Sequence, residues 1–221
     1  MNKLDELSNK YGGRVRSLNR GTNEWNVGGD SSIIGNTKTY VEIFKKFEQE
    51  KINFLEIGIF QGRSLAMWCD YFKNGKIYGI DVSIKEFELM KPELEKMGAF
   101  KNKNLINPVS LDSSGNQYLD TPTVEEVLNM EDWKNVKFDI IIDDAKHTLK
   151  NNEETFLNFY PLLNDGGIYV IEDVNGWQEE LKSRIKLRKP SIKIKEIHHK
   201  EYSCARLLVL ENGNNWWSEN E

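Results

Sequence analysis

The chain has 221 residues, 38% of them hydrophobic and 11% aromatic, which suits one domain with an apolar core and excludes a wholly disordered protein. Its 30 Lys and Arg against 35 Asp and Glu give a net charge of −5, which excludes a global electrostatic attraction to nucleic acid or to an anionic membrane. With no apolar run long enough to span a bilayer, no apolar signal segment at the start and only two cysteines, the sequence predicts a cytoplasmic protein without a disulfide framework.

Residues 1–36 differ from the rest of the chain, because they are rich in glycine and turn-forming residues and only weakly periodic. Two interpretations stay open, a floppy leader or an arm that becomes ordered over a ligand, and we treat residues 1–36 as an N-terminal arm or lid. The main domain is expected to cover residues 37–221. It begins with a helix, since apolar side chains recur at helical spacing from Thr37 to Phe47.

Short apolar runs then alternate with amphipathic segments. The runs are typical of buried strands and cover residues 52–59, 76–83, 105–114, 138–145 and 167–174. The amphipathic segments predict helices over residues 64–72, 86–97, 124–130, 152–163 and 177–186. An alternating stretch over residues 191–199 and an apolar stretch over residues 204–212 then predict an antiparallel hairpin at a sheet edge. The alternation predicts an α/β fold with a parallel sheet covered by helices on both faces, so ligands should bind at the carboxyl ends of the strands.

The first two strands end in residues that suit a nucleotide-like ligand. Glu56 closes the first strand and is followed by Gly58 and Gly62, which let the backbone turn tightly and approach a ligand closely. Ser64 can cap the helix that comes next. Asp81 closes the second strand, where a carboxylate can accept hydrogen bonds from both hydroxyls of a ribose. An ordinary strand-to-helix turn and a helix-capping Asp are the alternative interpretations.

The next three strands also end in polar, mostly acidic residues: Asp112 and Ser113; Asp143 and Asp144 with His147 three residues on; Glu172 and Asp173. The first pair could contact a nucleobase or belong to an ordinary loop. Because neighbouring parallel strands lie about 4.8 Å apart, Asp144, Glu172 and Asp173 are expected to converge on one point. Burying several carboxylates without a counter-charge is unfavourable. The spacing therefore predicts an oxygen-rich site for Mg²⁺, with Mn²⁺ or Ca²⁺ as alternatives.

Together these strand ends resemble the class I S-adenosylmethionine-dependent methyltransferases. The similarity rests on Glu56-Ile-Gly58 with Gly62, Gly79-Ile-Asp81, Asp143-Asp144 with His147, Gly166-Gly167 and Ile171-Glu172-Asp173. The segments around them are most similar to the macrocin and mycinamicin sugar O-methyltransferase group, with the cephalosporin-hydroxylase-like proteins as relatives. The similar region runs from about Tyr40 to Val174.

The resemblance implies a Rossmann-like sheet of seven strands with helices on both faces and a C-terminal antiparallel hairpin. It implies two cofactors, S-adenosylmethionine and Mg²⁺ or another divalent cation. The residues it assigns to the S-adenosylmethionine site are Glu56, Gly58, Gly62, Ser64, Asp81, Asp112, Ser113 and Asp143. It also implies a metal held by Asp144, Glu172 and Asp173, with His147 as the general base and Asp144 as the second catalytic residue. Ala145-Lys146 departs from the Gly-Ser that usually precedes the His in this group.

The sequence thus predicts an O-methyltransferase that acts on a hydroxyl of a sugar or of a glycosylated small molecule. A catechol-type O-methyltransferase of an aromatic diol is the first alternative, and a non-catalytic protein on the same fold is the second. A nucleic-acid partner is a third, because residues 182–195 hold seven Lys or Arg, although such a run is more often a solvated face. Homo-oligomerisation stays open, with the arm and the Trp216-Trp217 tail as candidate interface elements.

Overall fold

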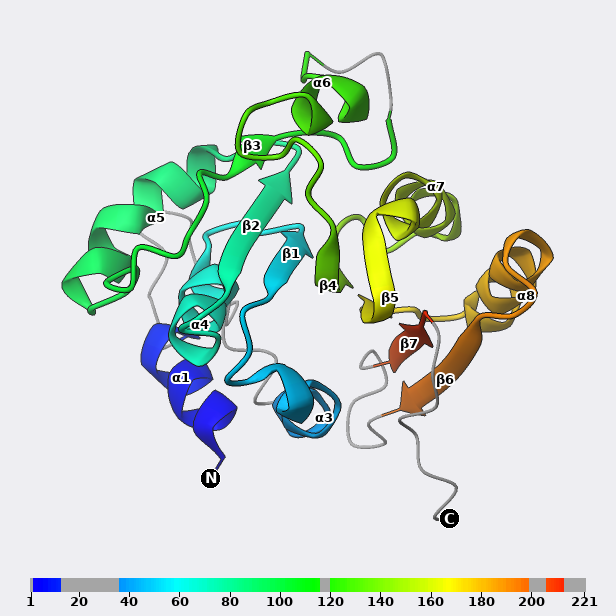
Figure 1. Ribbon diagram of the computed structural model, residues 1–221, viewed down its shortest axis with the longest axis horizontal. Coiled ribbons are helices and arrows are strands. Elements are labelled where there is room, and N and C mark those ends of the chain that lie inside the picture. Colours follow the sequence, from blue (N-terminus) through cyan, green and yellow to red (C-terminus); the bar gives the residue numbers. More distant parts are fainter. Residues whose placement is uncertain (1, 13–35, 116–119, 199–205, 213–221) are drawn as a thin grey trace, which may run out of the picture.

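The structure is a computed structural model, and it describes residues 2–12, 36–115, 120–198 and 206–212. Within these residues seven strands form one sheet, in the order β3-β2-β1-β4-β5-β7-β6 (Figure 1). The strands are β1 Asn53–Ile57, β2 Lys76–Asp81, β3 Val109–Ser110, β4 Phe138–Asp143, β5 Leu163–Ile171, β6 Lys193–His198 and β7 Arg206–Glu211. Strands β1 to β5 pair in parallel, whereas β7 is antiparallel to both β5 and β6. The predicted fold class, including the C-terminal antiparallel hairpin, is confirmed.

Helices cover both faces of the sheet. They are α1 Lys3–Gly12, α3 Asn36–Phe44, α4 Arg63–Tyr71, α5 Lys85–Lys96, α6 Val124–Leu128, α7 Leu149–Phe159 and α8 Gln178–Arg188, with 3₁₀ turns η1 Lys45–Phe47 and η2 Tyr160–Leu162. Figure 1 shows α1, α3 and α4 on one side of the sheet and α7 and α8 on the other. Because side chains alternate along a strand, Phe54 joins the core on the α4 side while its neighbour Leu55 joins the core on the α7 side. None of the described helices is long and apolar enough to cross a membrane.

The N-terminal segment contains a helix that the sequence analysis did not predict. Leu4 and Tyr11 lie on one face of α1 and are fully buried in the core on the α4 side. The hydroxyl of Tyr11 donates to Asp70 at 2.5 Å, and the guanidinium of Arg63 donates to the main-chain oxygen of Tyr11 at 2.5 Å. This part of the predicted arm is therefore packed into the main body. Residues 13–35, the larger part of the segment 1–36 that was predicted to be an arm or lid, lie outside the described residues.

Strand β5 begins earlier than its apolar run suggests. Leu163 of β5 pairs with Phe138 of β4, but the next pair joins Ile168 to Ile140, so the register shifts between them. The extra residues of β5 include Asp165 and Gly166, and Gly166 donates from its main-chain N–H to Asn212 after β7. An added stretch of this kind is a bulge, which lets polar residues extend a strand that pattern analysis starts at residue 167.

Candidate active site

The carboxyl ends of β1, β4 and β5 meet at one edge of the sheet. In the register of these strands Ile57 faces Asp143, and Asp143 faces Ile171. Two main-chain hydrogen bonds continue the pairing beyond the strands, from Asp144 N to Ile57 O at 2.8 Å and from Glu172 N to Asp143 O at 2.9 Å. The acidic residues that follow β4 and β5 are thereby brought to the same place, as expected for parallel strands.

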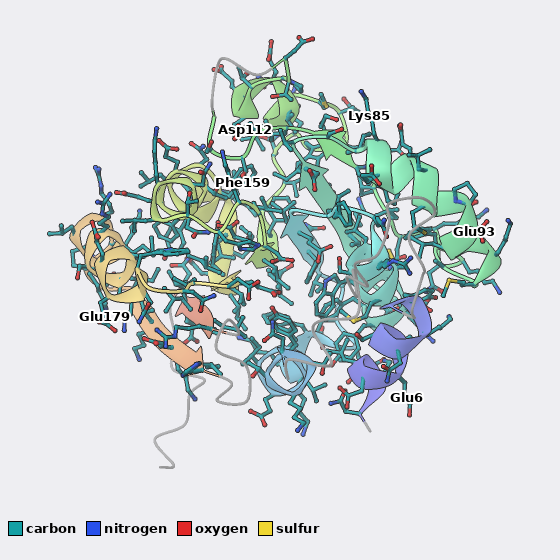
Figure 2. All side chains as sticks on the ribbon, turned by 180° about the vertical axis from the view of Figure 1, so that it is seen from behind. Glu6, Lys85, Glu93, Asp112, Phe159 and Glu179 are labelled. Atoms are coloured by element: carbon teal, nitrogen blue, oxygen red, sulfur yellow. The ribbon has the colours of Figure 1, made fainter. Side chains whose placement is uncertain are left out.

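A cavity of about 540 Å³ opens at this edge, within the size range of small-molecule sites. The residues that line it are Ile57, Gly58, Phe60, Asp81, Val82, Leu111, Asp112, Ser113, Asp144, Ala145, Lys146, His147 and Asn151. Six of the residues singled out from the sequence are among them: Gly58, Asp81, Asp112, Ser113, Asp144 and His147. The others, Glu56, Gly62, Ser64, Asp143, Glu172 and Asp173, are not lining residues. Figure 2 labels Asp112 close to α6, at the end of the sheet away from Glu6 of α1.

Asp81 connects the first two βα loops at the cavity wall. One carboxylate oxygen accepts from the main-chain N–H of Phe60 at 2.8 Å, and the other accepts from that of Ser83 at 3.2 Å. Phe60 itself has a φ of 42°, a conformation that non-glycine residues seldom adopt. Each oxygen of Asp81 keeps a further lone pair, so the carboxylate is held in place and can still accept hydrogen bonds from a ligand.

Asp112 and Ser113 are fixed by bonds within the protein. An oxygen of Asp112 accepts from the main-chain N–H of Ser114 at 2.9 Å and from its hydroxyl at 2.6 Å, so this side chain stabilises its own turn. The hydroxyl of Ser113 lies 2.9 Å from that of Thr155 on α7. The main-chain oxygen of Ser113 accepts from Asn158 at 2.8 Å. This wall of the cavity is therefore shaped by the protein before a ligand binds.

Glu56 is buried within β1 rather than exposed to the cavity. Its carboxylate accepts from the hydroxyl of Ser64 at 2.9 Å and from the indole N–H of Trp68 at 3.1 Å, both on α4. Burial raises the pKa of Glu56 to about 8, although these two donors favour the charged form. The expected capping role of Ser64 is wrong: α4 begins after Gly62, and the Ser64 hydroxyl is used by Glu56 instead.

The backbone conformation and close contacts of Gly58 and Gly62, in the loop after β1, require glycine at both positions. Gly58 has a φ of +90°, and a Cβ there would stand 2.2 Å from the main-chain oxygen of Asp144. Gly62 has a φ of +71°, and a Cβ there would stand 2.3 Å from the ring of Phe87. Any larger residue would combine an unfavourable backbone conformation with a steric clash.

Asp144, His147 and Asp173 form the tightest group of ligand atoms at this edge. One such atom from each residue lies within 4.8 Å of the other two, and the Nε2 of His147 is 3.6 Å from an oxygen of Asp144. His147 and Asp173 both have positive φ, 43° and 52°. Strained backbone of this kind persists where the surrounding structure imposes it and is concentrated at functional sites.

Glu172, next to Asp173 in the chain, is hydrogen-bonded to two donors on α3. One oxygen accepts from the hydroxyl of Tyr40, and the other accepts from the side-chain amide of Asn36 at 3.0 Å. Burial raises the pKa of Glu172 to about 7. The sequence analysis missed both donors: Tyr40 lies in an apolar helical pattern typical of a core residue, and Asn36 falls at the end of the turn-rich arm.

Asp143 is fully buried, and both of its oxygens are used inside the protein. They accept from the side chain of Asn152 on α7 at 3.2 Å and from the main-chain N–H of Ala145 at 3.3 Å. Burial raises the pKa of this carboxyl to about 7. The structure thus gives Asp143 a role in bracing the loop of residues 144–147, and its assignment to the cofactor site stays a prediction.

The carboxyl groups at this edge of the sheet have few basic partners that would stabilise their charged form. In the described part of the chain, Glu56, Asp143 and Glu172 form no ion pair with Lys or Arg, and Asp144 pairs only with His147. The pKa of Asp144 is raised well above its ordinary value, because burial opposes its charge and Glu172 and Asp173 repel it. Such a group of carboxylates is most favourable when a cation lies among them.

A family described as a methyltransferase domain matches residues 55–174. The 8-demethyl-8-alpha-L-rhamnosyl tetracenomycin-C 2'-O-methyltransferase of Streptomyces olivaceus is 27% identical over 169 residues, which are 72% of this chain and 36% of that protein. The demethylmacrocin O-methyltransferase of Streptomyces fradiae is 29% identical over 145 residues, 62% of this chain and 31% of that protein. The chain therefore spans about a third of the length of the curated relatives it matches.

The fold is similar to that of a larger solved structure. MycE methyltransferase from the mycinamycin biosynthetic pathway, in complex with Mg, SAH and mycinamycin VI, superposes with a TM-score of 0.63 at 22% identity. The superposition covers 100% of this chain and 56% of MycE. At this identity the likeness shows a shared fold.

Proposed function

The chain belongs to the methyltransferase-domain family, and from this premise we propose that it is an S-adenosylmethionine-dependent, divalent-metal-dependent O-methyltransferase of a sugar hydroxyl or of a glycosylated small molecule. The observation that carries the proposal is one cavity lined by residues suited to a methyl donor and by residues suited to an acceptor. Gly58 and Asp81 line it, and so do Asp144 and His147. A methyl donor bound by the first pair would therefore meet an acceptor held by the second.

The residues around Asp144 fit a divalent cation. Asp144 and Asp173 offer hard oxygen donors, and one ligand atom of each lies within 4.8 Å of the other and of one from His147, close enough for a shared cation. We assign Asp144 and Asp173 to the ion, with Glu172 as the third carboxylate. A bound cation would lower the pKa of an acceptor hydroxyl and hold its oxygen in place.

We assign the general base to His147. Its Nε2 faces an oxygen of Asp144, while its Nδ1 is buried and has no hydrogen-bond partner among the described residues. In the proposed reaction the new C–O bond forms as the C–S bond of the donor breaks, and the hydroxyl proton passes to His147. Asp144 stabilises the imidazolium that results.

We assign the donor site to the first three strand ends. Gly58 and Gly62 would let the loop approach the donor closely, and Asp81 has free lone pairs for the ribose. We assign the adenine to Asp112 and Ser113, which line the same cavity as Gly58 and Asp81. Glu56, Ser64 and Asp143 complete the assignment by holding these loops from inside. Residues 13–35, outside the described residues, are kept as the arm or lid of the 37–221 domain.

A sugar-bearing acceptor is favoured because the relative from S. olivaceus is named for a rhamnosyl substrate. A nucleic-acid partner is disfavoured because carboxylates already pair with basic residues of α8, part of the basic run of α8 and β6. Lys182 pairs with Glu179 at 2.5 Å and with Glu196 at 2.8 Å, and Arg184 pairs with Glu153 at 2.6 Å. The run is therefore partly neutralised by neighbouring carboxylates, as in a solvated face.

The proposal is tested by offering the purified chain S-adenosylmethionine and a panel of acceptors: mycinamycin VI, 8-demethyl-8-rhamnosyl tetracenomycin-C, a catechol and an RNA. We expect a gain of one methyl group on a glycosylated acceptor, detected by mass spectrometry, that requires Mg²⁺ and is abolished by a chelator. Methylation of the catechol alone would select the aromatic alternative. A chain that binds neither S-adenosylhomocysteine nor a divalent cation would contradict the proposal.

A further inference from the structure

Two polar side chains on α3 reach the same carboxylate. Asn36 and Tyr40 are four residues apart, so they lie on one face of the helix, and both are fully buried. Tyr40 donates from its hydroxyl to one oxygen of Glu172, and Asn36 donates from its amide nitrogen to the other at 3.0 Å. Each oxygen of Glu172 thus has its own donor, and the plane of the carboxylate is fixed.

The ring of Tyr40 is itself held in place on both sides. It stacks on Phe44 with a centroid distance of 5.2 Å and an interplanar angle of 4°. It packs edge-on against Trp68 with a centroid distance of 5.5 Å and an interplanar angle of 74°. The indole N–H of Trp68 is occupied by Glu56 at 3.1 Å. A ring packed in this way has one favourable position, so its hydroxyl stays directed at Glu172.

The hydrogen bond to Glu172 fixes the orientation of the Asn36 amide and leaves the amide oxygen without a partner among the described residues. Because the amide nitrogen faces the carboxylate, the amide oxygen is left buried without a hydrogen-bond partner among the described residues. The reversed amide would place two acceptors against each other. A buried acceptor without a partner is unfavourable, so the arrangement is not the best one for packing alone.

Glu172 lies where its orientation matters for the cation site. It precedes Asp173, and its main-chain N–H donates to Asp143, the neighbour of Asp144, at 2.9 Å. A carboxylate oxygen has two lone pairs, so each oxygen of Glu172 can accept from α3 and still face an ion.

We propose that Tyr40 and Asn36 are positioning residues of the cation site, which orient Glu172 so that it completes the ligand set of Asp144 and Asp173. The inference rests on the proposed metal dependence. It assigns to α3, which lies outside the cavity wall, a function in metal affinity rather than in donor binding. Removal of a residue that orients a metal ligand commonly lowers metal affinity by about 10- to 100-fold.

The test compares Tyr40→Phe with Tyr71→Phe in the full chain, using Mn²⁺ as the probe and electron paramagnetic resonance to count free ion. Tyr71 is a matched control, because it is a buried tyrosine that also packs on Trp68 and its hydroxyl forms no hydrogen bond with described residues. We expect Tyr40→Phe to weaken Mn²⁺ binding about 10- to 100-fold and Tyr71→Phe to leave it unchanged. Affinity for S-adenosylhomocysteine, measured by calorimetry, should be unchanged in both, which a general loss of structure would not allow.

A second variant, Asn36→Leu, keeps the size of the side chain and removes the donor, and it should weaken Mn²⁺ binding in the same direction. Saturating Mg²⁺ should restore methyl transfer in either variant, so the apparent Mg²⁺ requirement rises while the maximal rate returns. Wild-type Mn²⁺ affinity in both Tyr40→Phe and Asn36→Leu would overturn the positioning role and leave the metal proposal intact. Absence of Mn²⁺ binding by the unchanged chain would overturn both.

Discussion

The main-chain oxygen of Asp144 lies so close to Gly58 that a Cβ on that glycine would stand 2.2 Å from it. The contact joins the loop after β1 to the loop after β4, next to the hydrogen bond from Asp144 N to Ile57 O at 2.8 Å. The position of the Asp144 corner therefore depends on the absence of a side chain at residue 58.

Gly58→Ala should lower the free energy of unfolding and reduce S-adenosylhomocysteine affinity. The methyl group adds a clash with main chain to the strain of a φ of +90°, and the strain alone is worth about 1–3 kcal/mol. Gly176→Ala is the matched control, since Gly176 has a φ of +87° and no atom within 4 Å of an added Cβ. Both variants have similar backbone strain, so the difference between their free energies of unfolding in urea measures the clash at residue 58. Equal losses of stability would show that the main chain at Asp144 can move away from the added methyl group.

The strand ends were accessible to sequence analysis, but the contacts of α3 were not. Apolar runs that end near Asp81, Asp144 and Asp173 predict buried strands followed by charged residues. A parallel arrangement is enough to bring the ends of such strands to one edge of the sheet. The sequence around Tyr40 has no comparable signal. The helical spacing of apolar residues is the same whether the Tyr40 hydroxyl is exposed or hydrogen-bonded to a buried carboxylate. The partnership with Glu172 joins residues 132 positions apart and depends on how α3 lies on the sheet.

Helix α1 shows a second kind of limit. Leu4 and Tyr11 are spaced for one helical face, yet they stand among polar residues beside a glycine-rich stretch, so local composition favours a loop. Burial against α4, together with the bond from Arg63 to Tyr11, supplies the stability that the local sequence lacks. Tertiary contacts of this kind are absent from any local pattern.

His147→Ala should reduce methyl transfer by about 10²–10⁴-fold, the usual contribution of a general base, while Mn²⁺ and S-adenosylhomocysteine affinities stay unchanged. The reason is that the imidazole is proposed to take a proton and not to bind either cofactor. His198→Ala is the control, since His198 is an exposed residue on β6. A matching loss of Mn²⁺ affinity would instead make His147 a metal ligand, which its place in the 4.8 Å group would also permit.

Mg²⁺ should raise the unfolding temperature of the chain, and a chelator should reverse the rise. A ligand that binds only the folded state at about 100 times its dissociation constant adds about 2.7 kcal/mol of stability. Asp144→Asn should remove most of this effect, because it deletes a charge from the proposed ion site. The exposed Asp132→Asn, outside the cavity, should keep it. Equal Mg²⁺ stabilisation of all three proteins would place the cation elsewhere.

Glu56→Gln should change how stability depends on pH in the chain without metal or cofactor. Burial raises the pKa of Glu56 to about 8 from 4.5, so between these values the folded chain keeps a proton that the unfolded chain releases. The stabilising contribution of the protonated carboxyl is fully present below pH 4.5 and is lost as the pH rises to about 8, at up to about 1.4 kcal/mol per pH unit. Glutamine cannot ionise, and its amide oxygen can accept from the indole N–H of Trp68 while its amide nitrogen donates to the hydroxyl of Ser64. The free energy of unfolding of the variant should therefore fall less steeply over this window than that of the unchanged chain.

Urea unfolding at a series of pH values measures this difference directly. Asp143 and Glu172 have pKa values raised in the same direction, to about 7, and both remain in the variant, so the difference between the two curves reports Glu56 together with its repulsion of Glu172. Glu125→Gln, on the exposed side of α6, is the control and should run parallel to the unchanged chain. If the Glu56→Gln curve were also parallel, the carboxyl would be ionised throughout, which would require a cation beside it even without added metal.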